Sequence, residues 1–283
     1  MAIFTNQATL TYNGNSVNSN IVTGNITEVL NVTKTALVDT YAQGDSVTYV
    51  VSLTNTSASA ITGVTVTDNL GAYTFNETLL TPLDYREGSL AYYINGVLQP
   101  TPTVTGTSPL TVTGITLPAE GNAILVYETT ANAFAPIDTG STVTNEVSAI
   151  YPGISAPITA EETITVTDEP VLGITKALNP TNVAENNPLT YTFTISNTGN
   201  SEADATDNVV ITDTFNPILS DITVTLNGEV LLPTAYTYDE TTGVFTTASG
   251  AITVPAATFT QDPVTGVITV TPGITTLTVT GTV

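Results

Sequence analysis

The segment VTYVVSL, residues 47–53, decides the fold class. Val47, Tyr49, Val51 and Leu53 fall on one face of an extended chain, and the residues between them fall on the other. The same alternation recurs in LTYTFTIS, residues 189–196. Thr and Val recur at period two along the whole sequence, separated by turn signals such as NG, PG and TG, with no helical stripe. The sequence therefore predicts an all-β protein made of half-buried sandwich strands.

The chain also repeats itself. NVTKTA, residues 31–36, matches GITKAL, residues 173–178, and in both copies a tyrosine follows the lysine after fifteen residues. Matches continue in the same order with LTNT and ISNT, VTVTDNL and VVITDTF, and INGVL and LNGEV. Residues 114–125 then align without a gap with residues 266–277. The repetition predicts two tandem homologous domains, residues 29–168 and residues 169–283, each large enough to bury a core.

The second copy is expected to lack the last strands of the first. The first copy continues with a hairpin that includes STVTNEVSAIYPG, residues 141–153, whereas residues 277–283 match only residues 125–131. The opening stretch MAIFTNQATLTYNG, residues 1–14, matches that hairpin and places Asn6 where Asn145 stands. We therefore expect residues 1–28 to form a donor strand or hairpin that completes a second domain. The side chains expected to fill the groove share one face of the strand: Phe4, Asn6, Ala8, Leu10 and Tyr12.

Several of these motifs together resemble a known family. VTK, GDSVTYVVSLTNTS, VTVTDNL and STVTNEVSAIY are similar to the conserved repeat of bacterial surface proteins (domain of unknown function eleven) and to the isopeptide-forming domains of Gram-positive fimbriae. The two copies of the repeat together cover nearly the whole chain. The second copy departs from the pattern, because it reads AENNPLTYTF where the first reads GDSVTY and it lacks the terminal TN strand. It implies repeated immunoglobulin-like β-sandwiches used for structure or adhesion at cell surfaces.

Polar residues interrupt the apolar faces of the predicted strands. Period-two parity turns Lys34, Asp68 and Asn145 inward in the first copy, and Lys176 and Asp213 in the second. An unpaired buried charge costs several kcal/mol and an unsatisfied buried amide roughly 1–3 kcal/mol, so the core must compensate for them. One solution is a buried Lys34–Asp68 ion pair that is hydrogen-bonded to Asn145. The other is covalent: burial favours the neutral amine and the neutral acid, the amine attacks the carboxamide, and the acid transfers protons as ammonia leaves.

The fimbrial domains that the sequence resembles form such Lys–Asn bonds beside a carboxylic acid. The resemblance implies an intramolecular bond between Lys34 and Asn145, with Asp68 as the acid. In the second domain Asp213 is the expected acid. No asparagine equivalent to Asn145 follows Lys176, and Asn6 is the expected partner. Asn6 precedes Lys34 by 28 residues, close to the 31 residues between Asn145 and Lys176, so its hairpin should lead into domain one and the donor should be another copy of the chain.

Other polar residues are weaker candidates. Glu146 is out of phase with the core and corresponds to Gln7, so it is a less suitable acid. Asn55 and Asn197 fall on inward parity but are expected at turns or strand ends. The acidic stretch SEADATDN, residues 201–208, lacks the spacing of a calcium loop and is interpreted as a solvated loop.

These observations predict a structural subunit of a pilus-like filament that polymerises head to tail by donor-strand complementation. With no Cys, His or Trp, the sequence offers no thiolate or imidazole for a metal or a nucleophile pair, and we expect no metal, no cofactor and no enzyme beyond a single autocatalytic turnover. The net charge of -22 disfavours nucleic acid and anionic membranes. We expect an extracellular filament or a spore or cell surface, without a recognisable signal peptide or membrane span.

Two alternatives remain open. The first is a non-polymeric surface adhesin with buried Lys–Asp ion pairs, in which TPLDYREGSLAYY, residues 81–93, forms a ligand surface; this stretch is also interpreted as an insertion packing over a sandwich edge. The second is an accessory domain acting on carbohydrate, which the absence of His, Trp and a paired-carboxylate motif disfavours.

Overall fold

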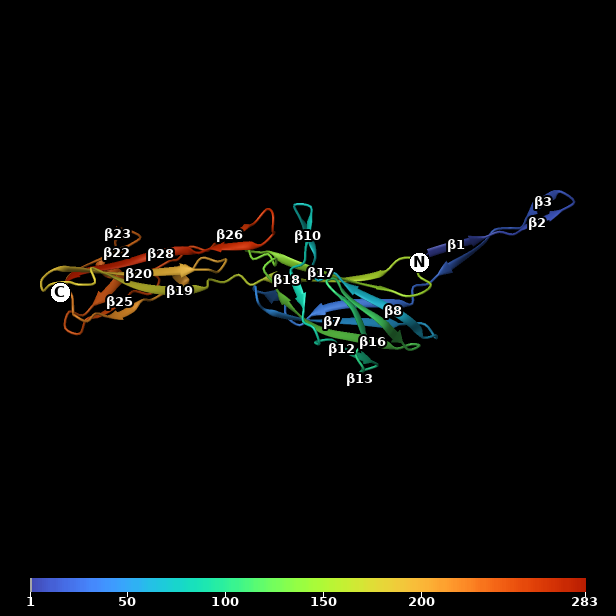
Figure 1. The fold of residues 1–283 in the computed structure, drawn as a ribbon, viewed down its shortest axis with the longest axis horizontal. Helices are drawn as coiled ribbons and strands as arrows, with labels where there is room; N and C mark the ends of the chain where they lie inside the picture. Colours follow the sequence, from blue (N-terminus) through green and yellow to red (C-terminus); the bar gives the residue numbers. More distant parts are fainter. Residues whose placement is uncertain (1) are drawn as a thin grey trace.

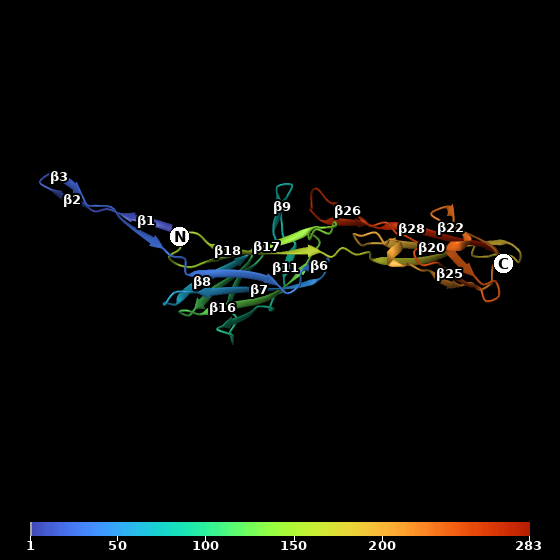
Figure 2. The ribbon, with the colours of Figure 1, turned by 180° about the vertical axis from the view of Figure 1, so that it is seen from behind.

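The computed structural model describes residues 2–283, so Met1, the first residue of the predicted N-terminal segment, lies outside the described part. The described chain consists of β-strands and two short 3-10 turns, which confirms the predicted all-β fold. An N-terminal arm, domain one and domain two follow one another along the long axis (Figures 1 and 2). No helix among residues 2–283 is long and apolar enough to cross a bilayer.

Domain one is a sandwich of two six-stranded sheets. The first sheet has the order β13-β12-β16-β7-β5, with β11 also paired to β16, and the second has the order β14-β15-β8-β17-β18-β6. The strands of the first sheet are β5 (Leu30–Ala36), β7 (Ser46–Asn55), β11 (Leu83–Tyr85), β12 (Ala91–Ile94), β13 (Val97–Gln99) and β16 (Asn122–Ala131). Those of the second are β6 (Thr40–Tyr41), β8 (Ile61–Asp68), β14 (Thr103–Thr107), β15 (Leu110–Leu117), β17 (Thr142–Ile150) and β18 (Ile158–Val166). A hairpin of β9 (Tyr73–Phe75) and β10 (Thr78–Leu80) projects from the side of the domain (Figure 1).

Domain two repeats one sheet without a counterpart of β11, and it repeats three strands of the other. Its larger sheet, β19-β20-β28-β22-β23, corresponds to β5-β7-β16-β12-β13. Its smaller sheet, β21-β25-β24, corresponds to β8-β15-β14 and stops at β21. The strands are β19 (Leu172–Asn179), β20 (Pro188–Asn197), β21 (Thr212–Thr214), β22 (Ser220–Leu226), β23 (Glu229–Val230), β24 (Tyr236–Tyr238), β25 (Val244–Thr247) and β28 (Gly273–Thr282), with 3-10 turns η1 (Ala205–Asp207) and η2 (Pro233–Ala235).

Alternating side chains of the strands build a separate core in each domain. Val47, Tyr49, Val51 and Leu53 are fully buried, as their period-two spacing predicts. Burying each such side chain contributes about 1.5–3 kcal/mol. The core of domain two is smaller and is built around Phe193, Phe215, Phe245 and Leu277 among others.

The N-terminal arm is a long hairpin made of two short ladders. β1 (Ala2–Asn6) pairs with β4 (Val22–Ile26), and β2 (Thr9–Tyr12) pairs with β3 (Asn15–Asn18). The turn between β2 and β3 is Asn13-Gly14, and both residues have positive φ, as the tight turn of a hairpin requires. Its large apolar side chains are exposed: Ile3, Phe4, Leu10, Tyr12, Val17, Ile21 and Val22. The arm therefore presents apolar surface that nothing in the described chain covers.

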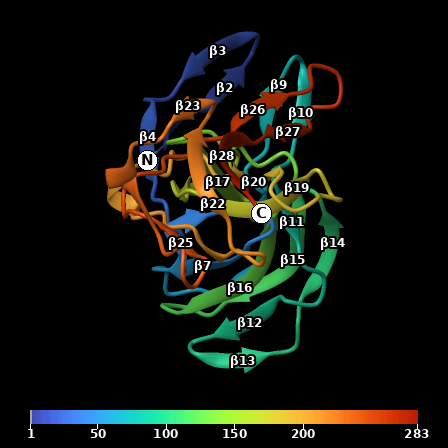
Figure 3. The same cartoon turned by 90° about the vertical axis from the view of Figure 1, so that its left-hand side faces the viewer.

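A second hairpin joins the two domains. β26 (Thr258–Gln261) and β27 (Ile268–Thr271) extend from domain two and lie beside β9 and β10 of domain one (Figure 3). Phe259, Ile268 and Val270 pack against the core of domain one. Gln261 Nε2 donates to the hydroxyl of Tyr73 at 2.8 Å. The gap-free alignment of residues 114–125 with 266–277 is therefore wrong before β28, because β25 rather than β27 pairs with β21 as β15 pairs with β8.

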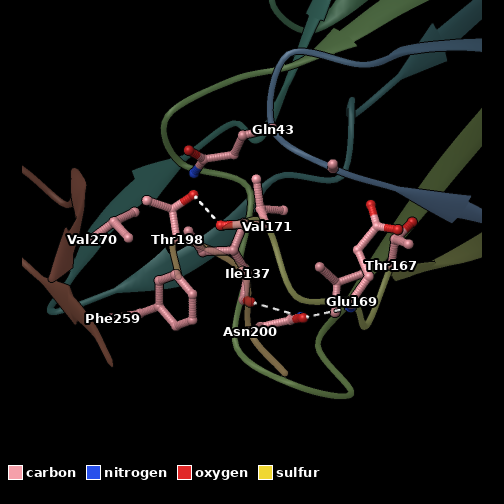
Figure 4. A pocket seen from close by; sticks show the side chains of 12 residues that line it. Gln43, Ile137, Thr167, Glu169, Val171, Thr198, Asn200, Phe259 and Val270 are labelled. Atoms are coloured by element: carbon pink, nitrogen blue, oxygen red, sulfur yellow. Dashed lines mark hydrogen bonds between the residues drawn. The ribbon is translucent and has the colours of Figure 1, made fainter. Parts of the chain in front are cut away.

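Figure 4 shows a pocket of about 250 Å³ in this joint. Asn200 anchors the linker there, because its Oδ1 accepts from the backbone N–H of Glu169 at 3.1 Å and its Nδ2 donates to the carbonyl of Ile137 at 3.2 Å. Glu169 is the one titratable residue among those that line the pocket. The pocket therefore lies between the two domains and does not bring several titratable side chains together.

Candidate functional site

A buried lysine and aspartate face each other across the sandwich of domain one. β5 alternates strictly, so Leu30, Val32 and Lys34 all point into the core. The side chain of Lys34 is 0% exposed and that of Asp68, at the end of β8 in the facing sheet, is 2% exposed. Lys34 Nζ donates to Asp68 Oδ2 and lies 4.6 Å from the ring centre of Tyr49. The pairing satisfies two charges that would each be costly in isolation.

The Asp68 carboxyl is held by two further donors. The hydroxyl of Tyr127, on β16, donates to Oδ2, and the backbone N–H of Leu70 donates to Oδ1 at 2.8 Å. Burial nevertheless lowers the pKa of Lys34 to about 8, because desolvation outweighs the opposing effect of Asp68 and of the more distant Glu162 and Glu146. About a tenth of Lys34 is thus a neutral amine at pH 7, able to act as a nucleophile.

Asn145 completes the site from β17. The strand lies between β8 and β18, and the Asn145 side chain is fully buried. Its Oδ1 accepts from the backbone N–H of Gly71 at 3.2 Å, whereas its Nδ2 is buried without a hydrogen-bond partner among the described residues. The Gly71 N–H therefore polarises the Asn145 carboxamide, whereas the carboxamide nitrogen makes no hydrogen bond within residues 2–283 that would stabilise it.

The equivalent pair in domain two is exposed. Lys176 Nζ donates to Asp213 Oδ2 and lies 4.3 Å from the ring centre of Tyr191, yet the Lys176 and Asp213 side chains are 40% and 20% exposed. Leu172 and Ile174, which correspond to Leu30 and Val32, are 41% and 56% exposed. Within residues 2–283, β21 pairs with β25 alone and spans three residues, whereas β8 pairs on both edges and spans eight.

The structure does not bring Asn6 to Lys176 within one chain. Asn6 ends β1 and pairs with Val22 in the arm, and the arm lies at the opposite end of the molecule from domain two (Figure 1). The predicted donor side chains Phe4, Asn6, Ala8, Leu10 and Tyr12 are all exposed. The structure thus assembles Lys34, Asp68 and Asn145, and leaves Lys176 with Asp213 apart from Asn6.

Sequence reasoning missed two residues of the domain-one site. Tyr127 shares inward parity with Ala123 and Leu125, so an inward tyrosine was visible, but its contact with Asp68 depends on how the two sheets face each other. Gly71 has φ +72, and a side chain there would collide with Val143, so the backbone approaches β17 closely. In the sequence, the signal for this close approach is the glycine that directly follows TDNL, residues 67–70.

The weaker candidates have structural roles. Asn55 and Asn197 end β7 and β20 and bond the backbone of the turns that follow, as expected. Glu146 lies on the exposed face of β17. Asp204 and Asp207 of the acidic stretch cap η1. Much of the stretch 81–93 is β11 and β12, which pair with β16.

No protein-family model matches the sequence, and no curated protein matches it. Among solved structures, the chain is similar to the pilus backbone RrgB from Streptococcus pneumoniae, with 13% identity over 86% of this chain and 55% of that one, at a TM-score of 0.35. It is similar to BcpA, the major pilin subunit of Bacillus cereus, with 11% identity over 96% of this chain and 73% of that one, at a TM-score of 0.35. The collagen-binding domain of a Staphylococcus aureus adhesin has 14% identity over 50% of this chain and 99% of that one, at a TM-score of 0.30. At these TM-scores the similarities carry no argument about function.

Proposed function

We propose that this protein is the structural subunit of a surface filament, in which the N-terminal arm of one copy completes domain two of the next. The observation that carries the proposal is the contrast between the two lysine sites, one closed by the hairpin β17–β18 and one left open. The arm resembles that hairpin in sequence and is itself a hairpin with exposed apolar side chains. Domain one therefore serves as a template for the closed form of domain two.

The template fixes the register of docking. In domain one, Val147 pairs with Asp68 and Ala149 with Val66. With Asn6 at the place of Asn145, Ala8 lies opposite Asp213 and Leu10 lies opposite Ile211, which extends β21 by main-chain hydrogen bonds. β3 and β4 then cover Leu172 and Ile174, as β18 lies over β5 in domain one. Each large apolar side chain that becomes buried contributes about 1.5–3 kcal/mol before ordering costs.

The contact is head to tail and propagates. Donor and acceptor lie at opposite ends of an elongated chain, so each added copy exposes a new acceptor or donor (Figure 2). A heterologous contact of this kind gives a filament unless the rotation closes a ring. The subunit's net charge of -22 makes assembly dependent on salt, since copies repel one another at low ionic strength.

Covalent bonds then make the assembly permanent. We expect Lys34 to bond Asn145 within domain one, and Lys176 to bond Asn6 between copies, each in one autocatalytic turnover. A filament linked in this way resists heat and detergent, because unfolding a domain no longer releases the subunit. Such a filament suits a cell or spore surface. The protein would act mechanically and would need no metal or cofactor.

Electron microscopy and denaturing gels of the purified full chain test this function. The proposal expects filaments, and a ladder of bands that survives boiling in detergent. The alternative, a non-polymeric adhesin, is favoured by the Lys34–Asp68 ion pair, which needs no bond to be stable in the core. Dispersed single particles at high concentration and at physiological salt, with one band on the gel, would support the adhesin and overturn the filament.

A further inference from the structure

Tyr127 contacts the acid of the domain-one site. Its hydroxyl donates to Asp68 Oδ2, the same oxygen that accepts from Lys34 Nζ. Tyr49 lies across the strand pair from it, with the two rings stacked at 6.0 Å, but the hydroxyl of Tyr49 interacts with the Asn145 side chain and makes no hydrogen bond to Asp68. Two equally buried phenols therefore flank the lysine, and only one of them holds the acid.

Domain two has no such hydroxyl. Val279 occupies the position of Tyr127, because it pairs with Tyr191 as Tyr127 pairs with Tyr49. Asp213 has a single backbone donor besides Lys176, the N–H of Thr214 at 2.9 Å. The two sites thus share lysine, acid and aromatic ring, and differ in the group that fixes the acid.

We propose that Tyr127 is the positioning residue for bond formation in domain one: its hydroxyl fixes the Asp68 carboxyl so that one oxygen faces Lys34 Nζ. This inference rests on the proposed Lys34–Asn145 bond. A proton passes from Nζ to Asp68, and the neutral Nζ attacks Cγ of Asn145. A second Nζ proton is carried to Nδ2, the Cγ–Nδ2 bond breaks, and ammonia leaves, so that an amide and a neutral Asp68 remain. An acid that stays aligned serves both proton transfers faster than a freely rotating carboxyl does.

Tyr127 is suited to this role because it remains a neutral phenol. Burial raises its pKa well above the usual value, so it keeps its proton through the pH range in which the amine reacts. A phenol can donate to the carboxylate and, after rotation of its O–H bond, accept from the carboxylic acid. The same side chain therefore serves both protonation states of Asp68.

Replacement of each hydroxyl in turn tests the inference. The full chain and its variants Tyr127→Phe and Tyr49→Phe are synthesised in a cell-free system, quenched at intervals, and digested. The peptide that joins Lys34 to Asn145, lighter by one ammonia, is then quantified. We expect Tyr127→Phe to slow its formation about 10- to 100-fold, the range seen when an orienting partner is lost. Tyr49→Phe removes a hydroxyl that interacts with Asn145 but not with Asp68, so it should slow formation by less than Tyr127→Phe does. We also expect the pH profile of the rate to change shape only in Tyr127→Phe, because that variant alone removes a hydrogen bond from the carboxyl.

The outcomes separate this inference from the proposed function. Equal rates and equal pH profiles in the two variants, with the bond forming normally in the unmodified chain, would overturn the role of Tyr127 and leave the filament proposal standing. A joined peptide missing from the unmodified chain would overturn both the bond and this inference. A loss of folding in Tyr127→Phe is recognised by the near-ultraviolet spectrum of the same variant in an Asn145→Ala background. In that case the hydroxyl is structural, and the inference fails.

Discussion

Leu30 and Leu172 occupy the same place in two copies of one domain, yet they are 4% and 41% exposed. Lys34 and Lys176, four residues further along the same strands, differ in the same way: their side chains are 0% and 40% exposed. Both lysines reach the aspartate of the facing sheet, so the ion pair does not depend on burial. What differs is the hairpin β17–β18, which domain one has and the described part of domain two does not. The ion pair therefore forms without the last hairpin, and the hairpin shields it from water.

The largest expected effect comes from removing the proposed hairpin substitute. Deletion of residues 1–12 should abolish assembly, because the strand that extends β21 and fills the groove is lost. Residues 3–12 are all exposed, so domain one should keep its melting temperature. Analytical ultracentrifugation and microscopy check the outcome. Filaments that persist in the deleted chain would show that another surface drives assembly.

The next effect separates docking from bonding. Asn6→Ala removes the carboxamide but leaves Phe4, Leu10 and Tyr12 in place, so filaments should still form. They should fall apart to single chains in hot detergent, because no bond joins the copies. The matched control is Asn145→Ala, which should leave the ladder of bands unchanged. A ladder in Asn6→Ala filaments would place the link elsewhere.

Asn145→Ala should weaken domain one instead. Losing a cross-link that closes so long a loop costs about 4–5 kcal/mol in the chain-entropy model that is used for disulfides. Calorimetry of the full chain should show a lower transition for domain one and an unchanged transition for domain two. An unchanged domain-one transition would mean that Lys34 and Asp68 form only an ion pair.

The smallest expected effect is a pH dependence that appears when the bond is prevented. In Asn145→Ala, Lys34 keeps its amine, with a pKa of about 8 in the folded chain against 10.5 in the unfolded chain. The unfolded state therefore binds more protons between these values, and the free energy of unfolding should rise with pH there, by roughly 3 kcal/mol at most. Above about pH 10 the trend should reverse, since burial raises the pKa of Tyr49 and the unfolded chain ionises its tyrosines first.

Denaturant unfolding of domain one between pH 7.5 and pH 9.5 measures this effect. The unmodified chain serves as the control, because a lysine that is already part of an amide no longer titrates and its stability should stay flat in the same window. Equal slopes in the two proteins would indicate that the amine of Lys34 is free in both.

Much of the fold could be predicted because it depends on local pattern. The alternation in residues 47–53 gave the strands, and the spacing from each lysine to its tyrosine gave two copies of one domain. The inward parity of Lys34, Asp68 and Asn145 also depends only on the period of a strand, and their side chains are buried in the structure.

The rest depends on contacts between distant segments. Residues 258–271 are rich in Thr and Val, as the core strands are, and only their packing on domain one shows that they form a hairpin between domains. The contact of Tyr127 with Asp68 joins two sheets whose relative placement no periodicity encodes. The exposure of Lys176 likewise follows from the lack of a second neighbour beside β21 in residues 2–283. The pattern of residues within domain two does not predict this.

The most direct measurement is mass spectrometry of digested filaments. The account predicts one peptide that joins Asn6 of one copy to Lys176 of the next and is lighter by one ammonia than its two parts. Purified filaments in which Asn6 and the amine of Lys176 are both recovered unmodified would contradict the bond. A chain that forms no filament at all would contradict donor-strand complementation.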